Sequence, residues 1–369
     1  MFYYFALFIV SLLVSMIIVP LLRQTAINGN TLDQPSERKI HKIAVPRLGG
    51  IAIAIAFFFS LGIGYAFLSN KEKYTESMIG LCIGASIIAL VGIWDDIRGL
   101  NAPKKFLGQI ASVLAALPFG FIIRELNIPF WGVIEVNSFA GFLLAIFWVV
   151  GIMNAINLID GIDGLAAGIS VKILSALFVV SLLTGEKQMA LVCIALAGAV
   201  VGFLRYNFHP ATIFMGDCGA LLLGFITSIV TVKVIFQNPS INSNSVVPVL
   251  LFGLPILDTT WAIIRRLLKH RKPFTADLGH LHHRLLNLGM TQRKVALTLY
   301  LINLLTVGAG ILVFLLNSNL VTLFTCVFMM IIGISIILTL RHISPQNDYA
   351  FEQDTKYDTK TENVFPENL

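Results

Sequence analysis

The sequence predicts an all-α integral membrane protein with about eleven transmembrane helices, an outside N-terminus and a cytoplasmic C-terminus. Three observations predict this fold. Of the 369 residues, 57% are hydrophobic and 12% are charged, and the mean hydropathy is +0.84. A soluble domain carries about 25% charged residues, so this chain cannot form a water-facing surface. Apolar windows of spanning length recur along the chain, and basic residues concentrate in alternate loops.

A helix that crosses the hydrocarbon core needs about 20 apolar residues. Such windows lie at 1–22, 48–68, 76–94, 106–123, 139–155, 164–184, 188–204, 213–236, 245–263, 296–316 and 319–340. The first window lacks a basic start and a small-residue cleavage site, so we expect a retained span rather than a signal peptide. The windows at 164–184 and 188–204 are the weakest, because the former contains Lys172 and the latter is short.

The orientation follows from the basic residues. With the N-terminus outside, the inner loops and the tail hold 20 of the 26 lysines and arginines, as the positive-inside rule requires. The net charge of +6 is then explained by loops that face anionic lipid, and no nucleic-acid binding is inferred.

We expect one transmembrane catalytic domain over residues 1–340 and a polar cytoplasmic tail over 341–369, which we predict to be disordered. The candidate active-site loops are 23–47, 95–105, 154–163, 205–212 and 264–295. The four cysteines show no paired spacing and are typical of small buried apolar residues.

The unusual polar residues all fall at the predicted cytoplasmic ends of the spans. They are Asp95 and Asp96; Asn154, Asn157, Asp160 and Asp163; Asn207, His209 and Asp217; Asp258; and His280, His282 and His283. Because the orientation was derived from lysine and arginine alone, this convergence is an independent indication of a functional face.

Asp95 and Asp96 are adjacent carboxylates, which repel each other unless a cation or a proton lies between them. One interpretation is a solvated helix end next to Arg98. The other is a metal ligand or general base, which Lys104 and Lys105 favour, because carboxylates and an ammonium group together suit a diphosphate held with Mg²⁺.

The stretch from Asn154 to Gly168 is the most specific signal. Its polar residues recur at every third position, which on one continuous helix drifts by about 60° per step. Gly161 and Gly164 therefore predict a helix break that folds Asp160 and Asp163 back toward Asn157. Loop capping is the alternative, but acids and amides at a membrane boundary are costly without a function.

Two further motifs allow several interpretations. Asp217 stands between glycines at the start of an apolar helix, where it suits both an N-cap and a metal ligand. His280, His282 and His283 stand beside Arg284, which suits donors to phosphate or sugar, a zinc site, or a basic loop without a role.

The segment from Asp33 to Gly50 combines basic residues, proline and a glycine pair. A positive-inside anchor explains its charges. It does not explain Pro46–Gly50, which is shaped for close approach of a ligand or of another backbone.

With these motifs the chain resembles the polyprenyl-phosphate N-acetylhexosamine-1-phosphate transferase superfamily, and most closely its undecaprenyl-phosphate GlcNAc-1-phosphate transferase branch, whose members initiate teichoic acid and O-antigen. The resemblance runs from Asp33 to Leu286. The sister branch, which transfers phospho-MurNAc-pentapeptide, has three consecutive histidines followed by an acid. The order His-Leu-His-His-Arg at His280 to Arg284 favours the GlcNAc branch.

The resemblance implies a role for each candidate residue. The predicted metal ligands are Asp217 and Asn157; the catalytic candidates are Asp95, Asp96, Asp160 and Asp163; and the substrate-binding candidates are Lys104, Lys105, Asn154, Asn207, His280, His282, His283 and Arg284. Within these sets, Asp95 and Asp96 are the implied proton acceptor and its partner, Lys105 or Lys104 holds the nucleotide diphosphate, and the histidines contact the sugar phosphate.

The implied reaction transfers GlcNAc-1-phosphate from UDP-GlcNAc to undecaprenyl phosphate at the cytoplasmic face of the bacterial plasma membrane, with Mg²⁺, or Mn²⁺ as substitute. Phospho-MurNAc-pentapeptide transfer is the alternative reaction, and a secondary transporter is the rival class. A transporter places its charges near the membrane midplane, often with repeat symmetry, and this chain shows neither. Membrane lipid is an expected partner, and a homodimer is compatible with the sequence.

Overall fold

The computed structural model describes residues 1–29, 31–34, 44–67, 75–237, 245–268, 270 and 279–343. The elements are α1 (Phe2–Asn28), β1 (Leu32–Asp33), β2 (Val45–Pro46), α2 (Gly49–Ala66), α3 (Thr75–Arg98), α4 (Ala102–Ala116), η2 (Leu117–Phe119), β3 (Glu125–Ile128), β4 (Gly132–Glu135), α5 (Ser138–Ile159), α6 (Leu165–Leu183), α7 (Lys187–Asn207), α8 (Gly216–Thr231), η3 (Val232–Phe236), α9 (Val246–Leu251), α10 (Gly253–Leu268), α11 (Leu281–Asn287), α12 (Gln292–Leu316) and α13 (Asn319–Ile343). The described residues are mostly helical, which agrees with the predicted all-α membrane protein, and they also form two short β ribbons. Parts of the predicted loops 23–47 and 264–295, and residues 344–369 of the predicted tail, lie outside the described residues.

Eight helices in the described part of the chain are long and apolar enough to cross a membrane: α1, α2, α3, α5, α6, α7, α8 with η3, and α12. The predicted window at 106–123 covers the later part of α4, a 15-residue helix that ends at Ala116, and the short η2 that follows it and contains Pro118. The window at 245–263 is divided at Phe252 into α9 and α10. Proline lacks the N–H that a helix interior needs, and Pro248 and Pro255 flank this break. The predicted orientation stays a prediction.

Helix α8 forms the centre of the bundle and contacts α2, α3, α5, α6 and α7. All of its residues are buried except Asp217. Small residues permit this close packing. A Cβ at Gly50 of α2 would overlap the backbone of Cys218 and Gly219, and a Cβ at Gly92 of α3 would overlap that of Asp217 and Cys218. Two neighbouring helices thus fix the start of α8.

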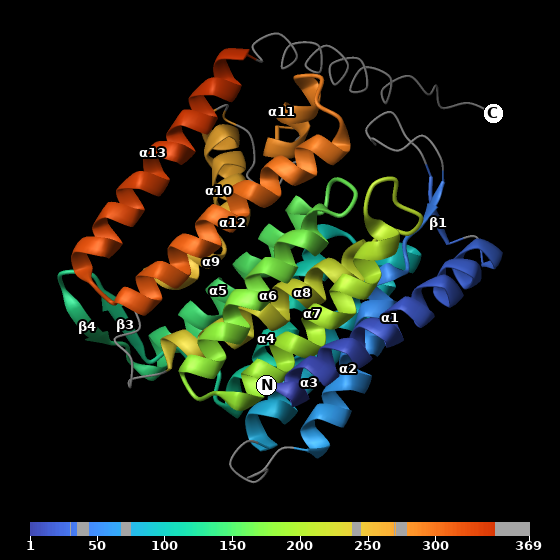
Figure 1. Ribbon diagram of the computed structural model, residues 1–369, viewed down its shortest axis with the longest axis horizontal. Coiled ribbons are helices and arrows are strands. Elements are labelled where there is room, and N and C mark those ends of the chain that lie inside the picture. Colours follow the sequence, from blue (N-terminus) through green and yellow to red (C-terminus); the bar gives the residue numbers. More distant parts are fainter. Residues whose placement is uncertain are drawn as a thin grey trace, which may run out of the picture.

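Short β structures mark the two ends of the bundle (Figure 1). At one end, β1 pairs antiparallel with β2, with Leu32 opposite Pro46. The β3–β4 hairpin lies at the other end, with Glu125 opposite Glu135. The ends of α5 and α7, the start of α8, and α11 lie at the β1 end, which therefore collects most of the polar motifs.

Candidate active site

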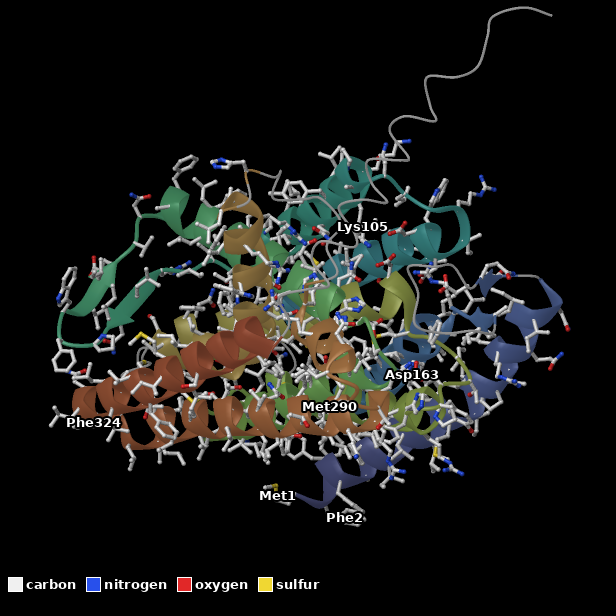
Figure 2. The ribbon with its side chains drawn as sticks, turned by 90° about the horizontal axis from the view of Figure 1, so that it is seen from above. Met1, Phe2, Lys105, Asp163, Met290 and Phe324 are labelled. Atoms are coloured by element: carbon white, nitrogen blue, oxygen red, sulfur yellow. The ribbon has the colours of Figure 1, made fainter. Side chains whose placement is uncertain are left out.

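A cavity of about 370 Å³ opens at the β1 end of the bundle. Its lining comes from the β1–β2 ribbon, the α5–α6 loop, the ends of α5 and α7, the start of α8, α11 and α12. The lining residues are Asp33, Arg47, Asn157, Asp160, Gly161, Ile162, Asp163, Asn207, Phe214, Met215, Gly216, Asp217, His283 and Gln292. Segments far apart in sequence thus bring six of the fourteen predicted site residues to one cavity. In Figure 2, Lys105 and Asp163 lie on the side away from the β3–β4 hairpin.

The break predicted after Asn157 is confirmed. Helix α5 ends at Ile159, and α6 begins at Leu165 after Gly164, whose φ of 75° is in the left-handed region that glycine adopts without strain. Asp163 Oδ2 lies 2.7 Å from His209 Nδ1 and accepts the Ala211 N–H at 3.1 Å. The α5–α6 loop is therefore tied to the segment before α8.

Asn207 fixes the same two segments. Its Oδ1 accepts the Gly164 N–H at 3.1 Å, and its Nδ2 donates to the Ile213 carbonyl at 2.9 Å. Both the oxygen and the nitrogen of the Asn207 amide are therefore used, and Asn207 links the α5–α6 loop to the segment before α8.

Asp160 lies in the cavity wall with no ion pair or hydrogen bond to its carboxylate among the described residues. Burial, with smaller contributions from the carboxylates of Asp217, Asp96 and Asp163, raises the pKa of Asp160 to about 7, and Arg47 opposes this shift. An open carboxylate with a raised pKa is typical of a group that awaits a cation or a ligand.

Asp96 caps α8 from a different helix. Its Oδ1 accepts the Asp217 N–H at 2.8 Å and its Oδ2 accepts the Cys218 N–H at 3.0 Å. The N-cap interpretation of Asp217 is wrong, because the capping carboxylate comes from α3 and the residue before α8, Met215, makes no side-chain cap. An anion at a helix N-terminus is stabilised by the exposed N–H groups and the helix dipole.

Asp95 and Asp217 meet at Lys105. The Lys105 ammonium lies 3.0 Å from Asp95 Oδ2 and 2.5 Å from Asp217 Oδ1, and the Leu100 N–H donates to Asp95 Oδ1 at 2.6 Å. The adjacent carboxylates therefore avoid mutual repulsion by facing different partners, Asp95 a lysine and Asp96 a helix end. Lys104 is exposed.

The histidines divide by environment. His280 Nδ1 lies 2.8 Å from Asp258 Oδ2, and the Leu281 N–H donates to Asp258 Oδ1 at 2.8 Å. His282 is 2% exposed, and neither of its ring nitrogens has a hydrogen-bond partner among the described residues. Burial, followed by the neighbouring His283, lowers the pKa of His282 to about 3, so its ring is neutral near pH 7. Of the three, His283 lines the cavity.

Six of the eight predicted substrate-binding residues lie outside the cavity lining, and two of them, Asn154 and Arg284, bond to other parts of the chain. Asn154 exchanges two hydrogen bonds with Gln109 of α4, at 2.8 and 3.2 Å, and also donates to the Val150 carbonyl. The Arg284 Nε donates to the Gly279 carbonyl at 3.1 Å.

Sequence reasoning did not select Asp33, Arg47 or Gln292 as site residues, although all three line the cavity. The signal for Arg47 was present in the Pro46–Gly50 block. The predicted close approach there is to another backbone: the Phe214 N–H donates to the Pro46 carbonyl at 2.7 Å, and the Gly50 N–H donates to the Met215 carbonyl at 2.7 Å.

The sequence is similar to a glycosyl transferase family and to several named transferases. Residues 78–235 match the model of glycosyl transferase family 4. The chain is 41% identical, over 80% of each chain, to a probable undecaprenyl-phosphate N-acetylglucosaminyl 1-phosphate transferase of Bacillus subtilis. It is 35% identical to a decaprenyl-phosphate N-acetylglucosaminephosphotransferase of Mycolicibacterium smegmatis, over 79% of this chain and 78% of the relative. It is 29% identical to a phospho-N-acetylmuramoyl-pentapeptide-transferase of Staphylococcus haemolyticus, over 79% of this chain and 93% of the relative.

Proposed function

We propose that this chain, which belongs to the polyprenyl-phosphate N-acetylhexosamine-1-phosphate transferase superfamily, transfers GlcNAc-1-phosphate from UDP-GlcNAc to undecaprenyl phosphate. The family match and the relatives confirm the resemblance to this superfamily, and the chain is a multi-pass membrane enzyme. The relatives are transferases, which disfavours the secondary-transporter alternative. The product would be the first lipid-linked intermediate of a cell-envelope glycan, made at the cytoplasmic face.

One observation carries the proposal: Asn157 and Asp160 at the end of α5 and Asp217 at the start of α8 line a single cavity. Its volume of about 370 Å³ falls in the range of small-molecule sites, about 300–1,000 Å³. Carboxylate and amide oxygens in one cavity suit a phosphorylated substrate that binds together with a hard cation.

The donor set fits Mg²⁺. Asp217 and Asn157 both line the cavity and offer a carboxylate and an amide oxygen, and Mg²⁺ prefers oxygen ligands. Mg²⁺ commonly binds through one or two protein ligands, with substrate phosphates and water completing its shell. When bound, Mg²⁺ would neutralise charge on the diphosphate. Asp217 and Asn157 are its proposed ligands, and Mn²⁺ is a proposed substitute.

The chain's own residues would act mainly by alignment. An oxygen of the lipid phosphate attacks the β-phosphorus of UDP-GlcNAc, the bond from this phosphorus to the bridging oxygen breaks, and UMP leaves with that oxygen. The acceptor is already an anion near neutral pH, so a general base contributes little. The hydrogen bonds of Asp96, Asp163 and Asn207 hold the cavity in one geometry. A fixed geometry lowers the barrier of this reaction by aligning the two substrates and by placing charged groups in advance.

Phospho-MurNAc-pentapeptide transfer is the second candidate, because the Staphylococcus haemolyticus relative carries that name. The 41% identity to the Bacillus subtilis relative favours GlcNAc-1-phosphate transfer. The two candidates differ in donor nucleotide, so they are separable with one protein preparation.

The test uses the purified full chain with undecaprenyl phosphate and Mg²⁺, and follows both UMP release and lipid-linked product. We expect turnover with UDP-GlcNAc, loss of turnover when EDTA removes the metal, and no turnover with UDP-MurNAc-pentapeptide. Turnover of the pentapeptide nucleotide alone would establish the second candidate. Absence of turnover with both nucleotides would overturn the proposal.

A further inference from the structure

The cavity holds far more negative than positive charge. Four carboxylates line it, those of Asp33, Asp160, Asp163 and Asp217. Among the described lining residues, Arg47 is the only arginine or lysine. Lys105 is engaged with Asp95 and Asp217 and lies outside the lining. A phosphorylated substrate would be repelled by this wall unless cations offset the carboxylates.

Arg47 is held beside Asp217 by its backbone. The preceding residue, Pro46, pairs with Leu32 in the β1–β2 ribbon and accepts the Phe214 N–H. The Gly49 N–H donates to the Phe214 carbonyl at 3.0 Å. A Cβ at Gly216 would lie against the Arg47 carbonyl oxygen. The segment that carries Arg47 is thus bonded on both sides to the residues that lead into Asp217.

Its side chain is also oriented. The Arg47 Nη1 lies 3.1 Å from Asp33 Oδ1, and the side chains are 38% and 10% exposed, respectively. A partly exposed ion pair adds little to stability, about 0–1 kcal/mol, so stability alone does not account for the pair. The guanidinium has five N–H donors in a planar fork, so the contact of Nη1 with Asp33 leaves other donors available in the cavity that Arg47 lines. A fork of this kind matches two oxygens of a phosphate.

We propose that Arg47 binds a phosphate group of the substrate in this cavity, and that Asp33 is a positioning residue that orients its guanidinium. The inference rests on the proposed function for the identity of the substrates. The phosphate belongs either to the lipid acceptor or to the sugar nucleotide, because both present the same paired oxygens.

The experiment measures kcat and the KM of each substrate for the wild type, Arg47→Gln and Arg47→Lys, with Arg98→Gln as control. Arg98 is exposed at the end of α3, so its variant removes one positive charge outside the cavity. We expect Arg47→Gln to raise the KM of one substrate by about tenfold or more, with a smaller change in kcat. The KM of Arg47→Lys should lie between those of the wild type and Arg47→Gln, since lysine keeps the positive charge and lacks the planar fork of donors. The substrate whose KM rises identifies the source of the phosphate.

Asp33→Asn tests the positioning role. It should raise the same KM by a smaller factor, and it should add nothing when combined with Arg47→Gln, because the residue it orients is then absent. If both KM values of the folded Arg47→Gln and Arg47→Lys variants stay within about twofold of the wild type, the proposal is overturned, whatever happens to kcat. If only Arg47→Lys folds, its KM values decide.

Equilibrium binding separates this inference from the proposed function. The Kd of UDP-GlcNAc and of undecaprenyl phosphate is measured for the same variants without turnover. A wild type that binds but does not react contradicts the proposed function, while the Kd shift of Arg47→Gln still decides the role of Arg47. A wild type that reacts, with KM and Kd unchanged in Arg47→Gln, contradicts the role of Arg47 alone.

Discussion

The α5–α6 loop and the start of α11 are built alike. In each, a carboxylate meets the Nδ1 of a histidine and accepts one backbone N–H: Asp163 with His209 and Ala211, and Asp258 with His280 and Leu281. Each region also leaves one group without a hydrogen-bond or ion-pair partner among the described residues, the Asp160 carboxylate in the loop and the His282 ring in α11. The acids and histidines that look equivalent in sequence therefore form two groups. Holding residues bond to other segments of the chain, and open residues have no hydrogen bond or ion pair within the described protein.

The largest effect on turnover is expected at the cavity itself. Asp217→Asn keeps the size of the side chain and removes the charge that we assign to the metal and that Lys105 faces at 2.5 Å. We expect turnover to fall by about 10²–10³-fold, measured as UMP release at saturating Mg²⁺. Wild-type turnover in this variant would contradict the assignment of Asp217 to the metal.

The two aspartate–histidine pairs should differ in what they contribute to stability. The Asp258 side chain is 2% exposed and its histidine 6%, against 14% and 36% for Asp163 and His209. We expect Asp258→Asn to cost roughly 3 kcal/mol and Asp163→Asn roughly 1 kcal/mol, because an unpaired donor costs more where water cannot replace its partner. Thermal unfolding of both variants in one detergent tests this, and the reverse order would contradict the assigned burial.

The raised pKa of Asp160 makes the stability of the folded protein depend on pH. Its pKa rises from 3.8 to about 7 on folding, so between these values the unfolded chain is ionised while the folded chain keeps the proton. The contribution of Asp160 to stability is present below about pH 4 and is lost as the pH rises to about 7. With EDTA present, we expect the melting temperature of Asp160→Asn, relative to the wild type, to be higher at pH 8 than at pH 5. A difference that does not vary with pH would contradict the raised pKa of Asp160.

The smallest effect on turnover is expected at Asn154, which bonds to Gln109 outside the cavity lining. Asn154→Ala should lower the melting temperature, because it leaves a Gln109 group unpaired at a cost of about 1–3 kcal/mol. Its kcat should stay within about threefold of the wild type. A loss of turnover without a loss of stability would instead place Asn154 at the substrate, as the sequence predicted.

Most of the helices were predictable because spanning length and hydropathy are local properties. The break at Asp160–Gly164 was predictable for the same reason, since spacing and glycine indicated it. The division of window 245–263 was missed although Pro248 and Pro255 signalled it. The β3–β4 hairpin was also missed, because its strands have only four residues each.

The partners of the site residues were not predictable. Asp96 and the α8 N–H groups that it caps are 121 and 122 positions apart, and nothing local to α3 indicates that pairing. The same holds for Asp258, which was recognised as an unusual acid while its role in fixing His280 depends on how α10 and α11 fold together. Long-range packing thus decides that Asp96 caps the N-terminus of α8 while the adjacent Asp95 pairs with Lys105.

The division into holding and open carboxylates is tested most directly by the melting temperatures of Asp96→Asn and Asp160→Asn, measured side by side at pH 8 in EDTA. Asp96 accepts two backbone N–H groups, whereas Asp160 has no partner among the described residues. The account predicts that Asp96→Asn melts below the wild type, that Asp160→Asn melts at or above it, and that both lose turnover. Equal destabilisation by the two substitutions, or a wild-type melting temperature for Asp96→Asn, would contradict it.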